Sequence, residues 1–403
     1  MANVSSSNGL EKRPKLRFPG FDEPYRSTQL GDIAALVNRT DPKSNAPIMM
    51  LSAGNGFIMQ SDKYSRDNAG QSLKKYILLK QGELAYNHGA SKAKQFGCCY
   101  ELTEPEARIP YVYHCFKIND HEYTPFIAMT LNNAQMDKQL KRLVSSSVRM
   151  DGLLNISFED YMSVTIHLPS PSEQKHIADF LQKIDERIAA QEKLLASLKK
   201  YKRGVMRAIF RDKAMLVSKT TKWKSVRMGT ECAFFSGGTP KSTDSRYYGG
   251  TIPFIRSGEI HEEQTELFLT SEGLRNSSAK MVSKGDLILA LYGATSGEVD
   301  ISRIDGAINQ AILCIRPAEI NRIFLKYLLE DSKDDILNTY LQGGQGNLSA
   351  EIIKSLVVDV PDERSQQGIV DFLSVIDQRI NNSLSCIETL MKLRSGLMQQ
   401  LFI

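Results

Sequence analysis

Apolar residues recur along two stretches of the chain with the 4-3-4-3 spacing of a coiled-coil seam. The first seam runs from Ile177 to Ile209, and the second runs from Ile369 to Leu401. Helices whose apolar residues recur every 3.5 residues pack against one another along that seam. The pattern therefore predicts two long helices. At 1.5 Å per residue, a helix over residues 172–210 would be about 58 Å long.

The two predicted helices are copies of one another. Residues 169–210 align with residues 361–402 without a gap, and 15 of the 42 aligned pairs are identical. Average composition would give only about two or three identities. Polar residues interrupt both seams at matching positions, which accidental substitutions would not do. We interpret these residues as devices that fix helix register. Two matched pairs interrupt the seams: Gln191/Ser383 and Lys202/Arg394.

The repeat also includes shorter segments outside the helices. Matching segments stand at the start of each half and just before each helix: 25–31 with 223–229, 155–157 with 347–349, and 164–168 with 356–360. The separation is 198 residues for the first pair and 192 for the others, so the intervening regions differ by insertion. Each half thus has a shared start, a divergent middle and a shared helix.

The divergent middles contain short apolar runs bounded by glycine and proline, which predict strands. Strands are expected over residues 76–79, 84–86, 109–113, 286–292 and 311–315, and helices over residues 126–143 and 321–337. The expected fold class is α+β. It consists of two mixed, β-rich domains, each followed by a long helix, with the two helices pairing as an antiparallel coiled coil of pseudo-twofold symmetry. Such a pair would hold the two domains at opposite ends of a rigid spacer.

These patterns divide the chain into six parts. They are an N-terminal tail (1–20), a first mixed domain (20–168), a first spacer helix (169–212), a linker (213–222), a second mixed domain (223–360) and a second spacer helix (361–403).

The net charge of +5 is modest, but the basic residues are concentrated at the end of the first helix. Eight of them lie between Lys193 and Lys213, against one acid, Asp212. Such a run is either a solvated helix face or a surface for phosphates or an acidic partner. Composition does not decide between these two.

Several features point to a cytoplasmic protein. The six cysteines show no C-x-x-C pair, so we expect free thiols in a reducing compartment. No apolar run approaches the roughly 18 residues that span a bilayer, and the polar N-terminus lacks the apolar region of a signal peptide. We therefore expect no membrane partner.

The sequence offers little catalytic machinery. The segment Gly237 to Ser242 lacks the spacing of a phosphate-binding loop, and Pro240 removes a backbone donor from it. His261 is followed by Glu262, but no second histidine stands four residues after His261 to complete an H-E-x-x-H zinc motif. A motif for gripping a flipped adenine and a glycine-rich loop for S-adenosylmethionine are also missing. We expect no catalytic residue, no metal site and no cofactor in this chain.

The middles do carry side chains suited to reading DNA. Arg and Lys suit guanine edges and phosphates, whereas Asn and Gln suit adenine edges. Each candidate is also compatible with an ordinary solvated loop. The candidates are Tyr86, Asn87, His88, Ser91, Lys92 and Lys94 in the first half, and Thr239, Lys241, Arg256, Ser257, Tyr292, Thr295, Asn309 and Gln310 in the second.

A third apolar row widens the stripe on both helices beyond the needs of a two-helix seam. This row either packs against the chain's own flanking domains or forms a docking face for a partner subunit. It comprises Phe180, Leu194 and Tyr201 on the first helix, and Phe372, Cys386 and Leu393 on the second.

Taken in order, these motifs resemble the specificity (HsdS) subunits of type I restriction-modification systems over nearly the full length. The resemblance rests on the duplicated helices and on four motifs of the second half: residues 223–229, Gly237-Gly238-Thr239-Pro240 with Ile252-Pro253-Phe254-Ile255, Lys284-Gly285-Asp286-Leu287, and Gly306-Ala307-Ile308-Asn309-Gln310. In the first half, Gln81 to Asn87 corresponds to the Gly-Asp strand, but a clear Gly-Gly-Thr-Pro turn is missing.

This resemblance implies a non-catalytic subunit with two target-recognition domains. Each domain would read one half of a bipartite, asymmetric site in double-stranded DNA, and the helices would set the gap. The partners would be two modification subunits, which bind S-adenosylmethionine and methylate adenine, and optionally two restriction subunits, which use ATP and Mg. Three rivals stay open: a free-standing bipartite DNA-binding regulator, a self-contained nuclease or methyltransferase, and a purely structural scaffold.

Overall fold

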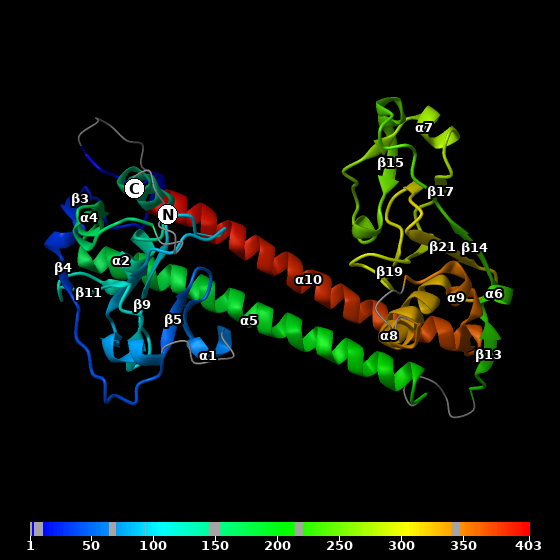
Figure 1. Cartoon of the computed structure of the whole chain (residues 1–403), viewed down its shortest axis with the longest axis horizontal. Coiled ribbons are helices and arrows are strands. Elements are labelled where there is room, and N and C mark those ends of the chain that lie inside the picture. Colours follow the sequence, from blue (N-terminus) through cyan, green and yellow to red (C-terminus); the bar gives the residue numbers. More distant parts are fainter. Residues whose placement is uncertain are drawn as a thin grey trace. The chain divides into compact units, whose positions relative to one another are not determined.

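The structure is a computed structural model that describes residues 2–3, 11–63, 70–92, 94–144, 154–213, 221–340 and 347–403. The chain divides into two compact units. Unit 1 comprises Met1–Gln191 and Cys386–Ile403, and unit 2 comprises Glu192–Ser385. Both long helices contribute to both units, because α5 (Pro171–Phe210) and α10 (Glu363–Leu401) are each divided between them (Figure 1).

The long helices pack in antiparallel fashion within each unit, as the repeat predicts. In unit 1 the first half of α5, with Ile177 and Leu181, shares a core with Leu401 at the end of α10. In unit 2 the end of α5, with Ile209, shares a core with Ile369 and Leu373 at the start of α10. Seam residues of both helices therefore contribute to the core of each unit.

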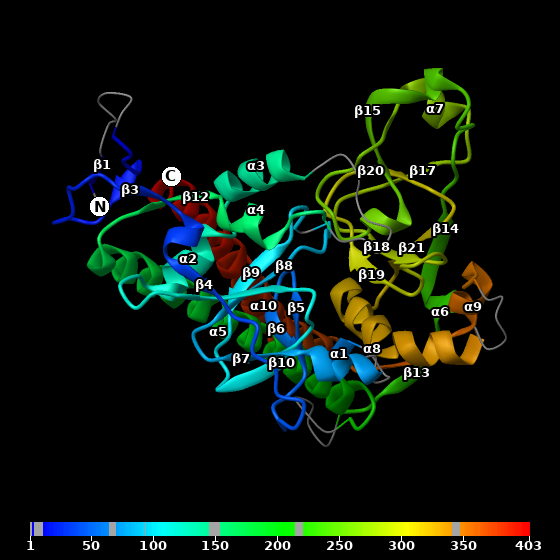
Figure 2. The ribbon, with the colours of Figure 1, turned by 60° about the vertical axis from the view of Figure 1, so that its left-hand side comes forward.

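Each unit contains a four-stranded antiparallel sheet with the same strand order, as Figure 2 helps to follow. In unit 1 the order is β4 (Ala34–Leu36), β11 (His114–Ile118), β8 (Leu84–Asn87) and β9 (Cys98–Glu101). In unit 2 it is β14 (Cys232–Ser236), β21 (Ile312–Pro317), β18 (Leu287–Ala290) and β19 (Val299–Ile301). The divergent middles thus share a fold, and the predicted α+β class is confirmed.

The repeated segments before each helix pair with the segments that start each half. Strand β3 (Arg26–Gln29) pairs antiparallel with β12 (Thr165–Leu168), and β13 (Lys224–Arg227) pairs in the same way with β22 (Val357–Val360). The start and end of each mixed domain therefore meet where the long helix begins.

Two repeated glutamines fix this junction. Gln174 donates from Nε2 to the Pro169 carbonyl at 3.0 Å and accepts at Oε1 from the Tyr123 backbone N–H at 2.9 Å. Gln366 makes the equivalent bonds, donating to Pro361 at 3.0 Å and accepting from the Asn321 N–H at 2.8 Å. These buried contacts account for the identity of proline and glutamine in both copies.

A glycine-acid turn opens the equivalent strands β8 and β18. Gly82 and Gly285 have φ angles of +82° and +93°, which favour glycine. The following acids are buried and each binds an arginine through both carboxylate oxygens: Glu83 with Arg39, and Asp286 with Arg316. Burial acts to raise the pKa of Asp286, but hydrogen bonds from Arg316 and the Ser283 N–H outweigh it and lower that pKa. The predicted correspondence between these two segments is confirmed.

Two secondary-structure predictions for the first half are wrong. The expected helix over residues 126–143 is two helices, α2 (Thr124–Thr130) and α3 (Ala134–Leu143), because Asn133 caps α3 by accepting from two backbone N–H groups. The expected strand over residues 109–113 is instead the connection between β10 (Glu106–Ile109) and β11. The Tyr113 N–H donates to the Pro110 carbonyl there and closes a turn. The helix predicted over residues 321–337 is confirmed as α8 (Arg322–Tyr340).

The remaining elements complete both units. Unit 1 also contains β1 (Ala2–Asn3), β2 (Leu16–Arg17), η1 (Leu30–Asp32), β5 (Met49–Ser52), β6 (Gly56–Met59), α1 (Gln60–Lys63), η2 (Gly70–Lys75), β7 (Ile77–Lys80) and α4 (Phe158–Met162). Unit 2 also contains α6 (Met228–Glu231), η3 (Ser245–Tyr247), β15 (Tyr248–Ile255), η4 (Ser257–Glu259), β16 (Phe268–Leu269), α7 (Ser271–Arg275), β17 (Lys280–Val282), β20 (Gly306–Ile308) and α9 (Ala350–Ser355). In unit 2 a second sheet has the order β16-β15-β20-β17.

The end of the predicted N-terminal tail packs against α5. Arg17 is buried and forms an ion pair with Glu173, with 2.7 Å between Nη2 and Oε2. Most of the predicted linker, residues 214–220, lies outside the described residues. Within the described ranges, no helix has the length and hydropathy needed to cross a bilayer.

Candidate nucleic-acid interface

A double-glycine turn in unit 2 lies against the end of β20. A Cβ on Gly237 would lie 1.8 Å from the Ile308 carbonyl oxygen, and a Cβ on Gly238 would lie 1.8 Å from Ser278 Oγ. The Gly238 N–H donates to the same Ile308 carbonyl at 3.2 Å. No side chain fits at either position, so the two glycines allow the chain after β14 to contact the segment that follows β20.

This close approach brings together polar side chains that are far apart in sequence. The Thr239 hydroxyl donates to Oε1 of Gln310, and the same glutamine is close enough to Tyr292, which follows β18, to affect the pKa of the tyrosine. Asn309 is held beside them, since its N–H donates to the Ile255 carbonyl at 3.2 Å. We call Thr239, Tyr292, Asn309 and Gln310 the polar cluster.

The polar cluster is accessible to a ligand. Thr239 and Gln310 are exposed, and Tyr292 and Asn309 are partly buried. Partial burial raises the pKa of Tyr292, while the polar side chain of Gln310 acts in the opposite direction. The cluster therefore offers hydroxyl and amide groups, which are the groups that read base edges by hydrogen bonding.

The other predicted residues of the second half differ in their availability. Lys241 is exposed two residues beyond Thr239, and Thr295 lies in the turn after β18. Ser257 begins the short helix η4. Arg256 is held by its own neighbours: it binds both oxygens of Glu259 and also Glu266, and these hydrogen bonds raise its pKa. Its guanidinium is therefore engaged within the domain.

Two predicted residues of the first half belong to the core. Tyr86 is only 1% exposed, stacks on Tyr161 with 3.9 Å between ring centroids, and donates its hydroxyl to the Phe96 carbonyl at 2.6 Å. His88 is buried, and its ring nitrogens lie 2.9 and 3.0 Å from the Leu154 and Val112 carbonyl oxygens. Because side chains held in this way do not reach a DNA ligand, we leave both out of the proposed interface.

The remaining first-half candidates form a loop that folds on itself. Asn87 accepts from the Gly89 N–H, and the Ser91 hydroxyl accepts from the Lys94 N–H at 3.1 Å. The Lys94 ammonium donates to the Asn132 carbonyl at 2.8 Å, whereas Lys92 is exposed. Of these residues, Lys92 is the one whose exposed charge best suits a phosphate contact.

The sequence reasoning missed two residues that support the double-glycine turn. The Tyr248 hydroxyl donates to the Pro240 carbonyl at 2.9 Å, and Ser278 lies against Gly238. Neither residue belongs to a recognisable motif. Only the spatial contact between the turn and its neighbours reveals that they hold Thr239 in place.

The predicted docking row divides into buried and exposed members. Phe180 is partly buried and packs edge-on against Phe18 at 5.5 Å, and Phe372 packs against the core of unit 2. The two phenylalanines therefore follow the alternative in which the row contacts the chain's own domains. Three members are exposed to between 47 and 52%: Leu194, Tyr201 and Leu393.

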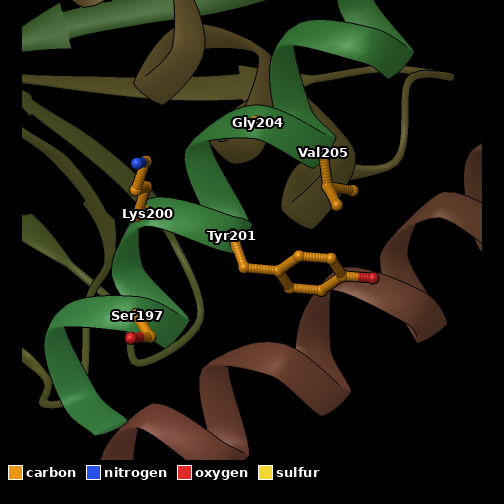
Figure 3. Close-up of a pocket in the computed structure, with 5 residues that line it drawn as sticks. All are labelled: Ser197, Lys200, Tyr201, Gly204 and Val205. Carbon is orange, nitrogen blue, oxygen red and sulfur yellow. The ribbon is translucent and has the colours of Figure 1, made fainter. Parts of the chain in front are cut away.

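An open groove of about 450 Å³ lies beside the exposed tyrosine of this row. Figure 3 shows Tyr201 and Val205 projecting from the same side of α5, with Gly204 on the turn that precedes Val205. The other lining residues are Ser197 and Lys200. The groove combines an aromatic ring, an aliphatic side chain and a backbone without a Cβ, which suits close packing by a partner helix.

Among the described residues, no group of three histidine, cysteine, aspartate or glutamate side chains is arranged to hold a metal ion. All six cysteines are free.

Comparison with known sequences gives a family match in each half of the chain. The type I restriction modification DNA specificity domain matches residues 25–200 and residues 220–387. The putative type I restriction enzyme MjaX specificity subunit of Methanocaldococcus jannaschii is 23% identical over 79% of this chain and 76% of the relative. The MjaVIII specificity subunit of the same organism is 24% identical over 60% of this chain and 62% of the relative.

Comparison with solved structures shows a shared fold. The type I restriction-modification S subunit from M. genitalium aligns with a TM-score of 0.63 at 15% identity, over 97% of this chain and 99% of the other. A chain from a study of complex assembly and conformational transition in a type I R-M system aligns with a TM-score of 0.58 at 15% identity, over 96 and 99%.

Proposed function

Because this chain belongs to the type I restriction modification DNA specificity family, with one specificity domain in each half, we propose that each domain reads one half of a bipartite, asymmetric site in double-stranded DNA. The two domains share a strand order but carry different side chains where equivalent strands end. His88 is the first residue after β8 and is buried. Tyr292 is the second residue after the equivalent strand β18 and belongs to the polar cluster. Different side chains on one frame give different half-sites.

The observation that carries this proposal is the polar cluster. Its hydroxyl and amide groups come from three segments and are held at one end of the unit 2 sheet by a turn that requires glycine. Glutamine and asparagine amides pair with adenine edges in the major groove, and a neighbouring exposed Lys241 suits a phosphate. The cluster would thus read bases of the second half-site.

We further propose that the groove on α5 and its repeat on α10 dock two identical modification subunits. The groove residues recur with similar chemistry 192 residues later: Ser197/Thr389, Lys200/Lys392, Tyr201/Leu393, Gly204/Gly396 and Val205/Leu397. A glycine inside a helix costs about 1 kcal/mol relative to alanine. A Cβ at Gly204 or Gly396 would meet nothing within 4 Å, so packing within the chain does not require either glycine. Close approach of a partner helix accounts for both.

In this proposal the chain itself catalyses no reaction. The modification subunits would bind S-adenosylmethionine and methylate adenine, and optional restriction subunits would use ATP and Mg. The helices would hold the two readers at a constant separation and so set the gap between the half-sites.

Co-expression with a type I modification subunit, followed by mapping of methylated adenines on genomic DNA, tests the proposal. We expect one motif with two specified blocks and a constant gap, and loss of the second block alone when the polar cluster is replaced. Tight specific DNA binding without any stable methyltransferase complex would instead support the regulator alternative. A motif with a single block would contradict the assignment of one half-site to each domain.

A further inference from the structure

The second half of α5 carries a basic face that the fold does not use. Lys193, Lys199, Arg203 and Arg207 are all exposed, and at 3.6 residues per turn they lie within an arc of about 120°. Over the described ranges, none of the four forms an ion pair or a side-chain hydrogen bond, although Arg207 lies within Coulombic range of Asp331. We call these four residues the basic face.

Other cations of the same run do have structural partners. Lys202 is buried between Glu330 and Asp377, at 2.7 and 2.8 Å. Arg211 binds Asp331 at 3.2 Å and Asp335 at 2.9 Å. The run therefore contains cations that are paired within unit 2, the exposed Lys200 of the groove, and the unpaired basic face.

The internal repeat serves as a control for the role of the basic face. The equivalents of Lys193, Lys199, Arg203 and Arg207 on α10 are Ser385, Met391, Ser395 and Gln399, which carry no charge. Between residues 193 and 207 there are six basic residues and no acid, whereas residues 385–399 contain two basic residues and one acid. Two identical partners would need the same surface in both copies, so their docking does not explain a charge present in only one.

Intrinsic helix energetics do not explain the basic face either. Cations stabilise a helix through the macrodipole only within its last turn, and Lys193 and Lys199 lie far from the end of α5. Like charges four residues apart, such as Lys199 with Arg203 and Arg203 with Arg207, destabilise an isolated helix by about 0.2–0.5 kcal/mol each. The face thus carries a cost that an external anion would offset.

We propose that the basic face is a second, sequence-independent DNA contact, which binds the phosphate backbone of a duplex. The four cations extend over about 21 Å of helix, which is the rise of about six phosphates along one strand. All four residues of the basic face are cationic, and none of them adds an apolar side chain. An acidic protein segment would be expected to use apolar anchors as well, so the composition favours a polyanion.

The test uses the full-length chain and a fluorescent duplex of random sequence. The variant K193Q/R203Q/R207Q removes three charges from the basic face and leaves the groove residues Lys200 and Tyr201 unchanged. Each lost phosphate contact should reduce the slope of log Kobs against log[salt] by about 0.9, so we expect a decrease of up to about 2.7. Glutamine is a good helix former, and circular dichroism checks folding.

The control variant K80Q/K138Q/K183Q removes three exposed lysines of unit 1 and the same net charge. It should retain the wild-type salt slope within about 0.5. Crosslinking gives a second measurement: Arg203→benzoylphenylalanine should crosslink to the duplex, whereas the matched Ser395→benzoylphenylalanine on α10 should not.

Equal salt slopes for the two triple variants would overturn the proposal. Loss of a co-purifying protein without a change in slope would also overturn it, and would assign the face to an acidic protein partner. Because random-sequence DNA is used, the outcome does not depend on the proposed reading of half-sites. The two proposals can also fail separately. If the wild-type chain shows no sequence preference, but the salt slope still falls in K193Q/R203Q/R207Q, the proposed function is contradicted and the phosphate contact of the basic face is supported.

Discussion

Lys202 on α5 forms an ion pair with Asp377 on α10 at 2.8 Å, and the repeat reproduces the pair with the roles exchanged. In unit 1 Arg394 of α10 binds both carboxylate oxygens of Asp185 on α5. Each partner lies 192 residues from its equivalent. The interruption at Lys202 and Arg394 therefore makes matched interhelical ion pairs, which accounts for the recurrence of a cation at this seam position.

We predict that Lys202→Met destabilises the chain more than Arg394→Met. Lys202 is 8% exposed, and although burial acts to lower its pKa, Glu330 and Asp377 outweigh it and raise that pKa. Lys202→Met removes charge-assisted hydrogen bonds to both carboxylates, while Lys326 stays beside Glu330 and Asp377, so a cost of about 1.5–3 kcal/mol is expected. The pair of Arg394 is more exposed, so about 1 kcal/mol is expected there.

Urea unfolding followed by circular dichroism measures this difference. The control is Lys392→Met, whose ion pair with Glu388 is largely exposed, and which should change stability by less than about 0.5 kcal/mol. An effect of Lys202→Met no larger than that of the control would show that the buried pair does not stabilise the helix junction.

Gly237→Ala should displace the turn that carries Thr239. The added Cβ would lie 1.8 Å from the Ile308 carbonyl oxygen, so the backbone must move, at a cost of about 1–3 kcal/mol. Gly258→Ala is the matched control, because a Cβ there meets nothing within 4 Å. We expect the first variant to lose discrimination at one half-site in a binding assay. Wild-type discrimination by Gly237→Ala would mean that the polar cluster tolerates this movement.

Gln310→Ala and Lys241→Ala should have different effects on DNA binding. Loss of a base-reading amide should relax specificity at one base pair by about 1–3 kcal/mol, with little change in salt dependence. Loss of a phosphate-binding lysine should weaken binding to all sequences and reduce the salt slope by about one. Titrations against a library of single-base variants, at several salt concentrations, distinguish the two. Uniform weakening by both variants would contradict a base-reading role for Gln310.

Docking of modification subunits should fail when the exposed members of the apolar row are removed. We expect Tyr201→Ala and Leu393→Ala each to lose one of two subunits, and the double variant to lose both, as measured by native mass spectrometry. Leu384→Ala is the control, because Leu384 is 44% exposed but its repeat equivalent is Glu192. Loss of subunits from the control instead would place the docking surface elsewhere on α10.

The elements that recur in both halves were predictable from sequence, because the patterns that define them lie within short segments of the chain. The period of 3.5 residues defines α5 and α10, and the glycine-acid turns open β8 and β18 in both halves. The break between α2 and α3 escaped detection because it depends on one asparagine, Asn133, whose side chain caps a helix that apolar periodicity alone would continue.

The polar cluster was predictable only as a set of residue types. Thr239 and Gln310 meet because β14 pairs with β21, which places the end of β14 beside the segment between β20 and β21. Neither segment's sequence predicts that pairing. Tyr86 illustrates the converse, a residue whose burial its own sequence segment does not reveal. Its neighbours Asn87 and Ser91 suggest a polar loop, but pairing of β8 between β9 and β11 turns the ring into the core.

The length of the long helices should set the length of the unread gap. The boundary between the two units falls after Gln191 on α5 and after Ser385 on α10. Inserting one heptad at each point keeps the apolar seam in phase and adds about 10.5 Å, which corresponds to about three base pairs. Methylation mapping should show a gap longer by about three base pairs with both half-sites unchanged. Insertion of two residues at each point rotates the seam by about 200° and should abolish stable folding, so it is the negative control. Altered half-site sequences after the heptad insertions would contradict a spacer role for the helices, because the readers would then depend on the helix pair for their geometry.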